Sequence, residues 1–421
     1  MAFSAIDWQK KIYLNGFAGK RPVVPTDFES LEHSARVRLS QQAYAYVSGG
    51  AGEQSTLRSN RVGFENIKIV PKMLRDVEIR NTTINLFGRS VPSPILFAPI
   101  GVLELVHPDG DLAVAKAAVN LDVPFIFSNQ ASVAMEHCAK VMGDKPRWFQ
   151  LYWSKSRALI SNFIHRAEAC GCETIVVTLD TTMLGWRPMD LNLGYLPFLE
   201  GKGIAQYTSD SVFQTMLDEP DATQYAKLPL SVEAIRGAIG MARRYPGNNL
   251  VAKITSGRPL RAVRKFIDIY SNPATTWDDL QFLRGLTKLN IILKGILHPD
   301  DAVKAIQFGM DGIIVSNHGG RQVDGAIATI QALPAVIEAV RNQIPVLLDS
   351  GVRTGADVFK ALALGAKAVC VGRPYVYGLA IAGQQGVEDV IHHMMTQFEL
   401  TMALAGCSQI SEINSTFVRT T

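Results

Sequence analysis

A histidine and an arginine, His318 and Arg321, lie three residues apart just after an apolar run at residues 312–315. The run contains consecutive β-branched residues, which is typical of a parallel strand covered on both faces. Two glycines between the pair let the backbone turn tightly and approach a ligand. Because histidine titrates near neutral pH and arginine carries a fixed planar charge, the pair could serve as a base and a carboxylate clamp. Alone, the pattern is a weak indication, since an isolated histidine more often has a structural role.

From Pro94 onward, short apolar runs alternate with helical segments. The runs lie at 95–98, 124–127, 148–151, 174–177, 291–294, 312–315, 345–348 and 368–371. Eight such βα units predict an α/β fold, a closed (β/α)8 TIM barrel whose active site lies at the carboxyl ends of the strands. An open doubly wound sheet is the competing architecture. It would need a glycine-rich nucleotide turn after its first strand, and residues 98–101 (APIG) do not provide one.

The residues that follow the predicted strands are mostly polar. In the last two units, glycines accompany Arg353 and Arg373, at a place where TIM barrels frequently bind phosphate on backbone amides and a helix N-terminus. A phosphate-bearing ligand is therefore predicted, with hydrogen-bonding side chains lining a flat polar ring system. The residues expected to gather at the mouth are Ala98, Ile100, Gly101, Ser128, Gln150, Tyr152, Thr178, Asp180, Lys294, Ser316, His318, Arg321, Asp349, Arg353, Gly372 and Arg373.

Two segments flank this pattern. Residues 1–90 are predicted to be helical and then irregular, with a helical stretch at 27–48 that ends at Gly49 and Gly50. The connection at 181–290 is far longer than an ordinary βα loop and contains two amphipathic helical patterns, at 232–245 and 260–270. Such an insertion is commonly a lid that excludes water, and a surface elaboration used in packing or assembly is an equally good interpretation of 220–275.

Composition excludes several classes of protein. With 421 residues, 47% hydrophobic and 19% charged, the chain can bury a large core as one domain or two, and we expect a single domain over 1–421. The net charge of +4 is small and scattered, so nucleic acid is not expected as a partner. The five cysteines lack paired spacing or a histidine cluster, and no metal site is predicted. Because no signal sequence or apolar run of about 20 residues occurs, a cytoplasmic protein without a membrane partner is expected.

Four segments together resemble the FMN-dependent L-2-hydroxy acid oxidase and dehydrogenase family. They are 149–152 (FQLY), 293–295 (LKG), 316–322 (SNHGGRQ) and 349–353 (DSGVR). The resemblance covers nearly the whole chain, from 46–52 to 399–403. Within the family, residues 97–102 and 184–188 most resemble the lactate 2-monooxygenase branch.

The resemblance implies FMN as cofactor, a small anionic 2-hydroxy acid such as L-lactate as substrate, and molecular oxygen as electron acceptor. It implies that His318 removes a proton while a hydride equivalent passes to the flavin, and that Asp180 favours the imidazolium. Tyr152 is expected to hydrogen-bond the substrate hydroxyl. The substrate carboxylate is expected to bind to Tyr46, Arg187 and Arg321.

Family cofactor contacts can also be carried over by position. Lys294 is expected to face the flavin edge where negative charge accumulates on reduction. The family also commonly forms homotetramers, so a homo-oligomer is expected. The positions that match cofactor contacts are Ala98, Ile100, Gly101, Ser128, Gln150, Thr178, Lys294, Ser316, Asp349, Arg353, Gly372 and Arg373.

Gly101 bears on the products. Oxidases of the family usually carry alanine there, and the missing methyl leaves room for the keto acid to stay while oxygen reacts. This favours lactate 2-monooxygenase, which gives acetate, carbon dioxide and water. An oxidase giving keto acid and peroxide, or a dehydrogenase with another acceptor, are the alternatives, and the glycine would then only permit the turn after Pro99.

Two other classes of protein are also alternatives. An FMN barrel for phosphorylated substrates would not need His318, Arg321 and Arg187 together, and a catalytically silent binding protein should have lost one of them.

Overall fold

Eight parallel strands close into a barrel in the computed structural model, which describes residues 4–219 and 231–421. The strands follow one another around the barrel in chain order, and the last, β11, pairs with the first, β4. The predicted TIM barrel is therefore confirmed, with every predicted strand observed within one or two residues of its expected place. The barrel strands are β4 (Ile95–Phe97), β5 (Phe125–Phe127), β6 (Arg147–Tyr152), β7 (Thr174–Thr178), β8 (Asn290–Ile296), β9 (Gly312–Val315), β10 (Val346–Leu348) and β11 (Val369–Val371).

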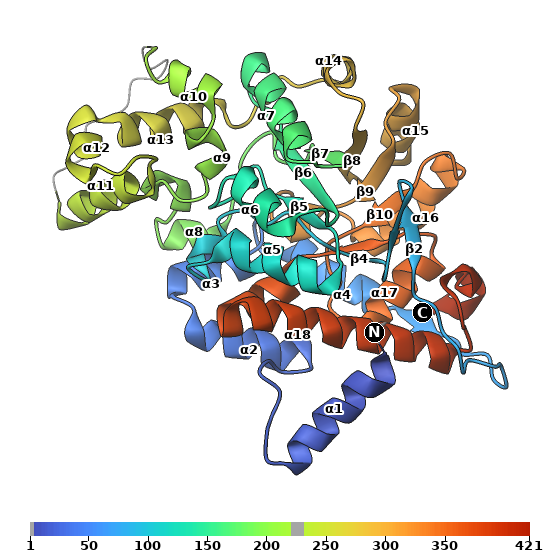
Figure 1. Ribbon diagram of the computed structural model, residues 1–421. Coiled ribbons are helices and arrows are strands. Elements are labelled where there is room, and N and C mark those ends of the chain that lie inside the picture. The colour runs from blue at the N-terminus through green and yellow to red at the C-terminus, as the bar shows by residue number, and fades with distance from the viewer. Residues whose placement is uncertain (1–3, 220–230) are drawn as a thin grey trace.

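Helices cover the outside of the barrel (Figure 1). The main apolar core lies between them and the strands, where side chains such as Phe97, Phe149 and Phe359 are fully buried. None of the helices in the described ranges is long and apolar enough to cross a membrane. The covering helices are α5 (Gly110–Leu121), α6 (Met135–Met142), α7 (Arg157–Ala169), α14 (Asp278–Leu286), α15 (Pro299–Gln307), α16 (Thr329–Val340), α17 (Gly355–Ala363) and α18 (Arg373–Ala405).

A hairpin that the sequence patterns did not predict covers the amino end of the barrel. It consists of β2 (Ile84–Leu86) and β3 (Arg89–Val91), and its apolar side chains join those of the barrel interior in a second core. The Phe87 ring lies edge-on to Trp148, near the start of β6, with ring centroids 5.7 Å apart. The site must therefore lie at the other, carboxyl end.

The N-terminal segment begins with α1 (Ala5–Phe17), α2 (Phe28–Arg38), α3 (Gln41–Ser48) and α4 (Ser55–Glu65). The single helical stretch predicted at 27–48 was wrong, because it is two helices. The Ser40 side chain accepts a hydrogen bond from the Ala43 N–H at 3.2 Å and so starts α3 after the chain has turned. After α4, β1 (Ile67–Ile69) pairs antiparallel with β12 (Val418–Thr420), so strands near the two ends of the chain lie side by side.

The long insertion after β7 lies together at one side of the molecule in Figure 1. Its two expected helices are observed, and α12 between them was not predicted. Of the lid expected at 220–275, residues 220–230 lie outside the described residues. The elements of the insertion are α8 (Pro188–Asn192), η2 (Pro197–Glu200), α9 (Ala205–Thr208), α10 (Ser211–Met216), α11 (Val232–Arg244), α12 (Leu250–Ser256) and α13 (Arg258–Ile269).

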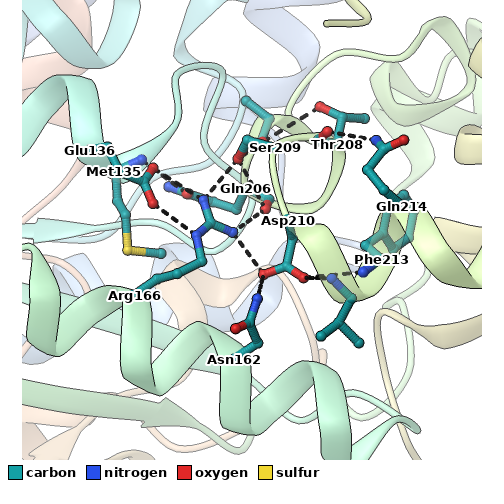
Figure 2. Close-up of polar contacts among 12 residues, drawn as sticks. Met135, Glu136, Asn162, Arg166, Gln206, Thr208, Ser209, Asp210, Phe213 and Gln214 are labelled. Atoms are coloured by element: carbon teal, nitrogen blue, oxygen red, sulfur yellow. Dashed lines mark hydrogen bonds and ion pairs between the residues drawn. The ribbon is translucent and has the colours of Figure 1, made fainter.

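Figure 2 shows how the first part of this insertion is anchored to the barrel helices. The Arg166 guanidinium on α7 bonds Glu136 on α6 at 2.8 Å and Asp210, which precedes α10, at 2.9 Å. Asp210 is fully buried and also accepts a hydrogen bond from Asn162. In the same region Gln206 accepts from the Met135 N–H at 3.0 Å. The hydrogen bonds and ion pairs around the buried Asp210 hold α9 and α10 against the barrel helices.

Candidate active site

A pocket opens at the carboxyl ends of the barrel strands and collects most of the predicted site residues. Three predicted residues do not line it but contact residues that do: Ser128 donates to Gln150, Asp180 bonds His318, and Ser316 accepts from Lys294. The predicted residues that line the pocket are Tyr46, Ala98, Ile100, Gly101, Gln150, Tyr152, Thr178, Arg187, Lys294, His318, Arg321, Asp349, Arg353, Gly372 and Arg373.

His318 and Asp180 form the central acid–base pair. The His318 Nδ1 lies 2.8 Å from the Asp180 Oδ1, so the Nε2 atom is the ring nitrogen left for a ligand. The His318 backbone has a φ of 57°, which is uncommon for a residue with a side chain and marks a constrained position. Two hydroxyls stabilise it: Ser316 Oγ accepts from the His318 N–H at 3.1 Å, and Ser350 Oγ accepts from the Gly319 N–H at 2.8 Å.

Opposing effects set the protonation of this pair. Burial lowers the pKa of His318 below its ordinary value even though the Asp180 carboxylate acts in the other direction. Burial would raise the pKa of Asp180, but the nearby His318 and Lys294 outweigh it and keep that pKa low. The pair is therefore a neutral imidazole beside a carboxylate, which can take up one proton and share the resulting charge.

Lys294 lies on β8 deep in the pocket. Its Nζ is 2.9 Å from Asp349 Oδ2 and donates to Ser316 Oγ at 2.9 Å. Burial opposes its charge, but the carboxylates of Asp349 and Asp180 outweigh this effect and raise the pKa of Lys294 above its ordinary value. A fixed positive charge therefore lies at the floor of the pocket.

Arg187 and Arg321 form a pair of cations on the side of the mouth near Tyr46. Arg187 donates to the Arg321 carbonyl at 3.2 Å and to Gln322 Oε1 at 2.8 Å, and Arg321 lies over the Tyr46 ring at 4.9 Å. A Cβ on Gly185 would be 2.6 Å from the Arg321 carbonyl, so only glycine lets the chain pass there. Burial and then Arg187 lower the pKa of Arg321 to about 9. Within the described residues neither forms a carboxylate ion pair, so the arrangement is ready to bind an anion.

A second pair of arginines lies where α18 begins. Burial and then the neighbouring Arg373 lower the pKa of Arg353 to about 9. The Arg353 Nε is buried without a hydrogen-bond partner among the described residues, and the guanidinium lies 4.2 Å from the Phe28 ring centroid. Arg373 is the first residue of α18, and among residues 4–219 and 231–421 no carboxylate pairs with either guanidinium. Two such cations beside the N-terminus of a long helix fit a phosphate group.

Other buried polar atoms test whether a flat polar ring system fits beside this phosphate site. Gln150 Nε2 and Thr178 Oγ1 are buried with no hydrogen-bond partner in the part of the chain that the structure describes, and both residues line the pocket. Such atoms are costly unless a ligand completes their hydrogen bonds. Together with Lys294, they would hold the polar edges of a flavin, while Arg353 and Arg373 would hold its phosphate. The side chains present therefore fit FMN.

Several residues that line the pocket were not predicted. Gln130 lies two residues after Ser128, and its position just past a strand end was a signal that could have revealed it. Thr181 follows β7 in the same way and bonds Asp180 at 3.1 Å. Phe198 and Tyr270 come from the insertion, and no sequence pattern indicated that they reach the pocket.

Comparison with known proteins agrees with this site. The profile of the FMN-dependent dehydrogenase family matches residues 35–420. An L-lactate oxidase from Lysinibacillus sphaericus is 40% identical over 93% of this chain and 92% of its own length. The FMN-dependent alpha-hydroxy acid dehydrogenase qulF from Penicillium citrinum is 39% identical over 98% of this chain and 95% of its own length. A crystal structure of mandelate oxidase with (S)-4-hydroxymandelic acid has a TM-score of 0.77 and 34% identity, covering 94% of this chain and 98% of that one. The resemblance found in the sequence is confirmed: the chain belongs to the FMN-dependent dehydrogenase family and is an FMN-dependent 2-hydroxy acid oxidoreductase.

Proposed function

We propose that this enzyme oxidises a small L-2-hydroxy acid, with L-lactate as the reference substrate, and uses molecular oxygen as the electron acceptor. One observation carries the proposal. Arg187 and Arg321, which form no carboxylate ion pair within the described residues, line the same pocket as His318, whose Nδ1 bonds Asp180. A carboxylate bound by the arginines leaves the 2-hydroxyl free to meet the histidine. The relative named L-lactate oxidase also supports this substrate class.

Each side chain has a role that its surroundings suit. Arg187, Arg321 and the Tyr46 hydroxyl bind the substrate carboxylate. Burial raises the pKa of Tyr152, so its phenol stays protonated and donates a hydrogen bond to the substrate oxygen. His318 Nε2 takes the hydroxyl proton, and the Asp180 carboxylate 2.8 Å from Nδ1 stabilises the imidazolium that results. Bound FMN supplies a two-electron acceptor for the hydride equivalent that leaves the substrate carbon.

The monooxygenase outcome rests on Gly101, which lines the pocket. Its φ is outside the left-handed region, so the turn after Pro99 does not itself require glycine. A Cβ at this position would lie 3.1 Å from both the Cβ and the carbonyl oxygen of Gln130. A methyl group would therefore crowd Gln130, and the hydrogen lets Gln130 keep its place at the pocket wall, which supports retention of the keto acid in the pocket. Retained pyruvate and hydrogen peroxide, formed in one closed site, give acetate, carbon dioxide and water.

Product analysis tests this function. Purified enzyme, free of catalase, is supplied with L-lactate in air, and acetate, pyruvate and peroxide are quantified. Acetate should be the main product, and Gly101→Ala should shift the products toward pyruvate and peroxide. Gly237→Ala, at a site with no atom within 4 Å of the added methyl, is the matched control and should give acetate. Stoichiometric peroxide from the unmodified enzyme would identify it as an oxidase. Flavin that lactate reduces but oxygen does not reoxidise would identify a dehydrogenase.

The organisation around the site is also part of this proposal. We propose that residues 1–421 act as one barrel domain, with the insertion at 181–290 as its lid, and that the enzyme is a cytoplasmic homotetramer. Phe198 and Tyr270 support the lid, since both belong to the insertion and line the pocket. Light scattering of the purified holoenzyme should give four times the chain mass of 46.0 kDa. A monomeric mass would contradict the assembly without affecting the chemistry.

A further inference from the structure

Two polar side chains in the pocket have no hydrogen-bond partner among the residues that the structure describes: the Gln130 amide and the Tyr270 hydroxyl. Gln130 is only 7% exposed. Since both residues line the pocket, their polar atoms are open to it and can bond water or a ligand. Neither group has a place in the acid–base pair, the carboxylate clamp or the phosphate site. Both are therefore available to a ligand group of another kind.

The backbone of Gln130 is held on both sides, so its side chain starts from a fixed point beside the pocket. Its N–H donates to Ser128 Oγ at 3.1 Å, and its carbonyl accepts from the Val102 N–H at 2.9 Å. Its side-chain Oε1 lies 3.6 Å from where a Cβ on Gly101 would be. The amide thus lies beside Gly101 at the pocket wall.

Tyr270 is held by aromatic packing. Its ring is stacked on Phe266, with centroids 5.0 Å apart and an interplanar angle of 19°, and it lies 6.4 Å from the Phe198 ring. These contacts fix the ring and leave the hydroxyl as its only polar atom. The residue comes at the end of α13, so the insertion places it in the pocket.

Gln130 and Tyr270 lie on one continuous wall. A Cβ on Gly203 would be 3.0 Å from the Gln130 carbonyl oxygen and 3.2 Å from Phe198 Cε1, so the main chain at Gly203 lies between them. Phe198 then contacts Tyr270. The wall offers an amide, a phenyl ring and a phenol, and no charged side chain.

We propose that Gln130, Phe198 and Tyr270 form a subsite for the side chain of the 2-hydroxy acid, and that the preferred side chain carries a neutral hydroxyl. This inference rests on the proposed function, because the carboxylate clamp orients the substrate. Amide and phenol groups both donate and accept hydrogen bonds, which suits a hydroxyl. A second carboxylate is disfavoured, since the wall holds no cation to offset its desolvation. L-Lactate is then a substrate that leaves the subsite's polar groups unpaired.

Two matched pairs of acids test the subsite by anaerobic flavin reduction in the holoenzyme. One pair is L-glycerate and L-lactate, and the other is L-2,4-dihydroxybutanoate and L-2-hydroxybutanoate. The dihydroxy acid of at least one pair should have a lower dissociation constant than its partner and a higher ratio of flavin-reduction rate to dissociation constant. Dividing this value for the dihydroxy acid by the value for its partner should give a preference ratio of roughly 10 or more, the effect of about two neutral hydrogen bonds.

Gln130→Met and Tyr270→Phe keep the size of each side chain and remove its hydrogen bonds. In each variant the ratio should fall by about threefold or more, with reduction by L-lactate measured in the same variant as the reference. Tyr245→Phe is the matched control, since Tyr245 also belongs to the insertion but does not line the pocket, and its ratio should stay unchanged. Lactate reduction confirms that each variant is folded and loaded.

Three results would overturn the inference in distinguishable ways. A ratio near one for both pairs in the unmodified enzyme, with normal reduction by lactate, rejects the subsite and leaves the proposed function standing. If the ratio stays unchanged in both variants, the two side chains do not bind the substrate hydroxyl. If the variants keep the ratio but their apoproteins bind FMN more weakly in titrations, the two side chains contact the cofactor instead. If no acid of either pair reduces the flavin, the proposed function fails and the subsite fails with it.

Discussion

Replacing Asp180 by asparagine isolates the electrostatic support of the base. The Asp180 carboxylate lies 2.8 Å from His318 Nδ1, and asparagine keeps the size of the side chain while removing its charge. The charge matters most once the imidazole has taken the substrate proton. A hydrogen bond between charged groups contributes about 1.5–3 kcal/mol. Since about 1.4 kcal/mol corresponds to tenfold in rate, anaerobic flavin reduction should slow by roughly 10- to 150-fold.

The pH dependence gives the sign of the effect. Burial lowers the pKa of His318 and Asp180 raises it, so removal of the carboxylate should lower this pKa further. The neutral base is the active form above its pKa. The acid limb of the kcat/KM profile should therefore move to lower pH in Asp180→Asn, although the maximum rate falls.

Stopped-flow reduction with L-lactate measures both quantities. Thr181→Val is the control, because it removes the hydroxyl that bonds Asp180 Oδ1 at 3.1 Å but leaves the charge. Its rate should fall by no more than about tenfold, as expected for a neutral hydrogen bond. An unchanged rate in Asp180→Asn, or an acid limb that moves to higher pH, would refute the role assigned to this carboxylate.

Four other substitutions address the remaining groups. His318→Gln should retain FMN and slow flavin reduction by roughly 10²–10⁴-fold, and near-normal reduction would place the base elsewhere. Arg187→Lys should raise the Kd for lactate by roughly 10- to 100-fold, because an ammonium cannot reproduce a planar guanidinium, and unchanged affinity would exclude it from the clamp. Arg353→Met should weaken FMN binding to apoprotein by roughly 10- to 100-fold in fluorescence titrations, whereas equal affinity would remove it from the phosphate site. Arg166→Met should destabilise the enzyme by about 3–5 kcal/mol in denaturant unfolding, because Asp210 is left buried and unpaired, and a smaller change than about 1 kcal/mol would contradict the anchoring role.

The barrel could be predicted because its strands are buried on both faces and so appear as uninterrupted apolar runs. The site could be predicted for a related reason: the carboxyl ends of parallel strands meet at one mouth, so His318, Lys294 and Arg353 had to converge once the barrel was assumed. The helix break at Ser40 was missed because the apolar residues keep helical spacing across it. The break depends on one serine side chain, which caps the start of α3.

Placement by long-range packing could not be predicted. The hairpin of β2 and β3 has strands of three residues each, too short to show a period, and its place is set by contact with Trp148 and the barrel interior. Tyr270 lies about ninety residues beyond β7, the strand that precedes the insertion, and lines the pocket with its ring packed against Phe198 and Phe266. The sequence around these residues indicates neither the place of the hairpin nor that Tyr270 reaches the pocket.

One carbonyl oxygen, that of Gly49, accepts hydrogen bonds from two different arginines, Arg321 at 3.1 Å and Arg373 at 2.9 Å. The blue α3 and the red α18 therefore lie side by side in Figure 1, although more than three hundred residues separate them along the chain. During synthesis, which proceeds from the N-terminus, the segment at Gly49 must wait for both arginines before its carbonyl is satisfied. The phosphate site includes Arg373 and is incomplete in a nascent chain that lacks α18, so cofactor loading comes at the end of biosynthesis, and a shortened barrel cannot serve as a minimal flavoprotein.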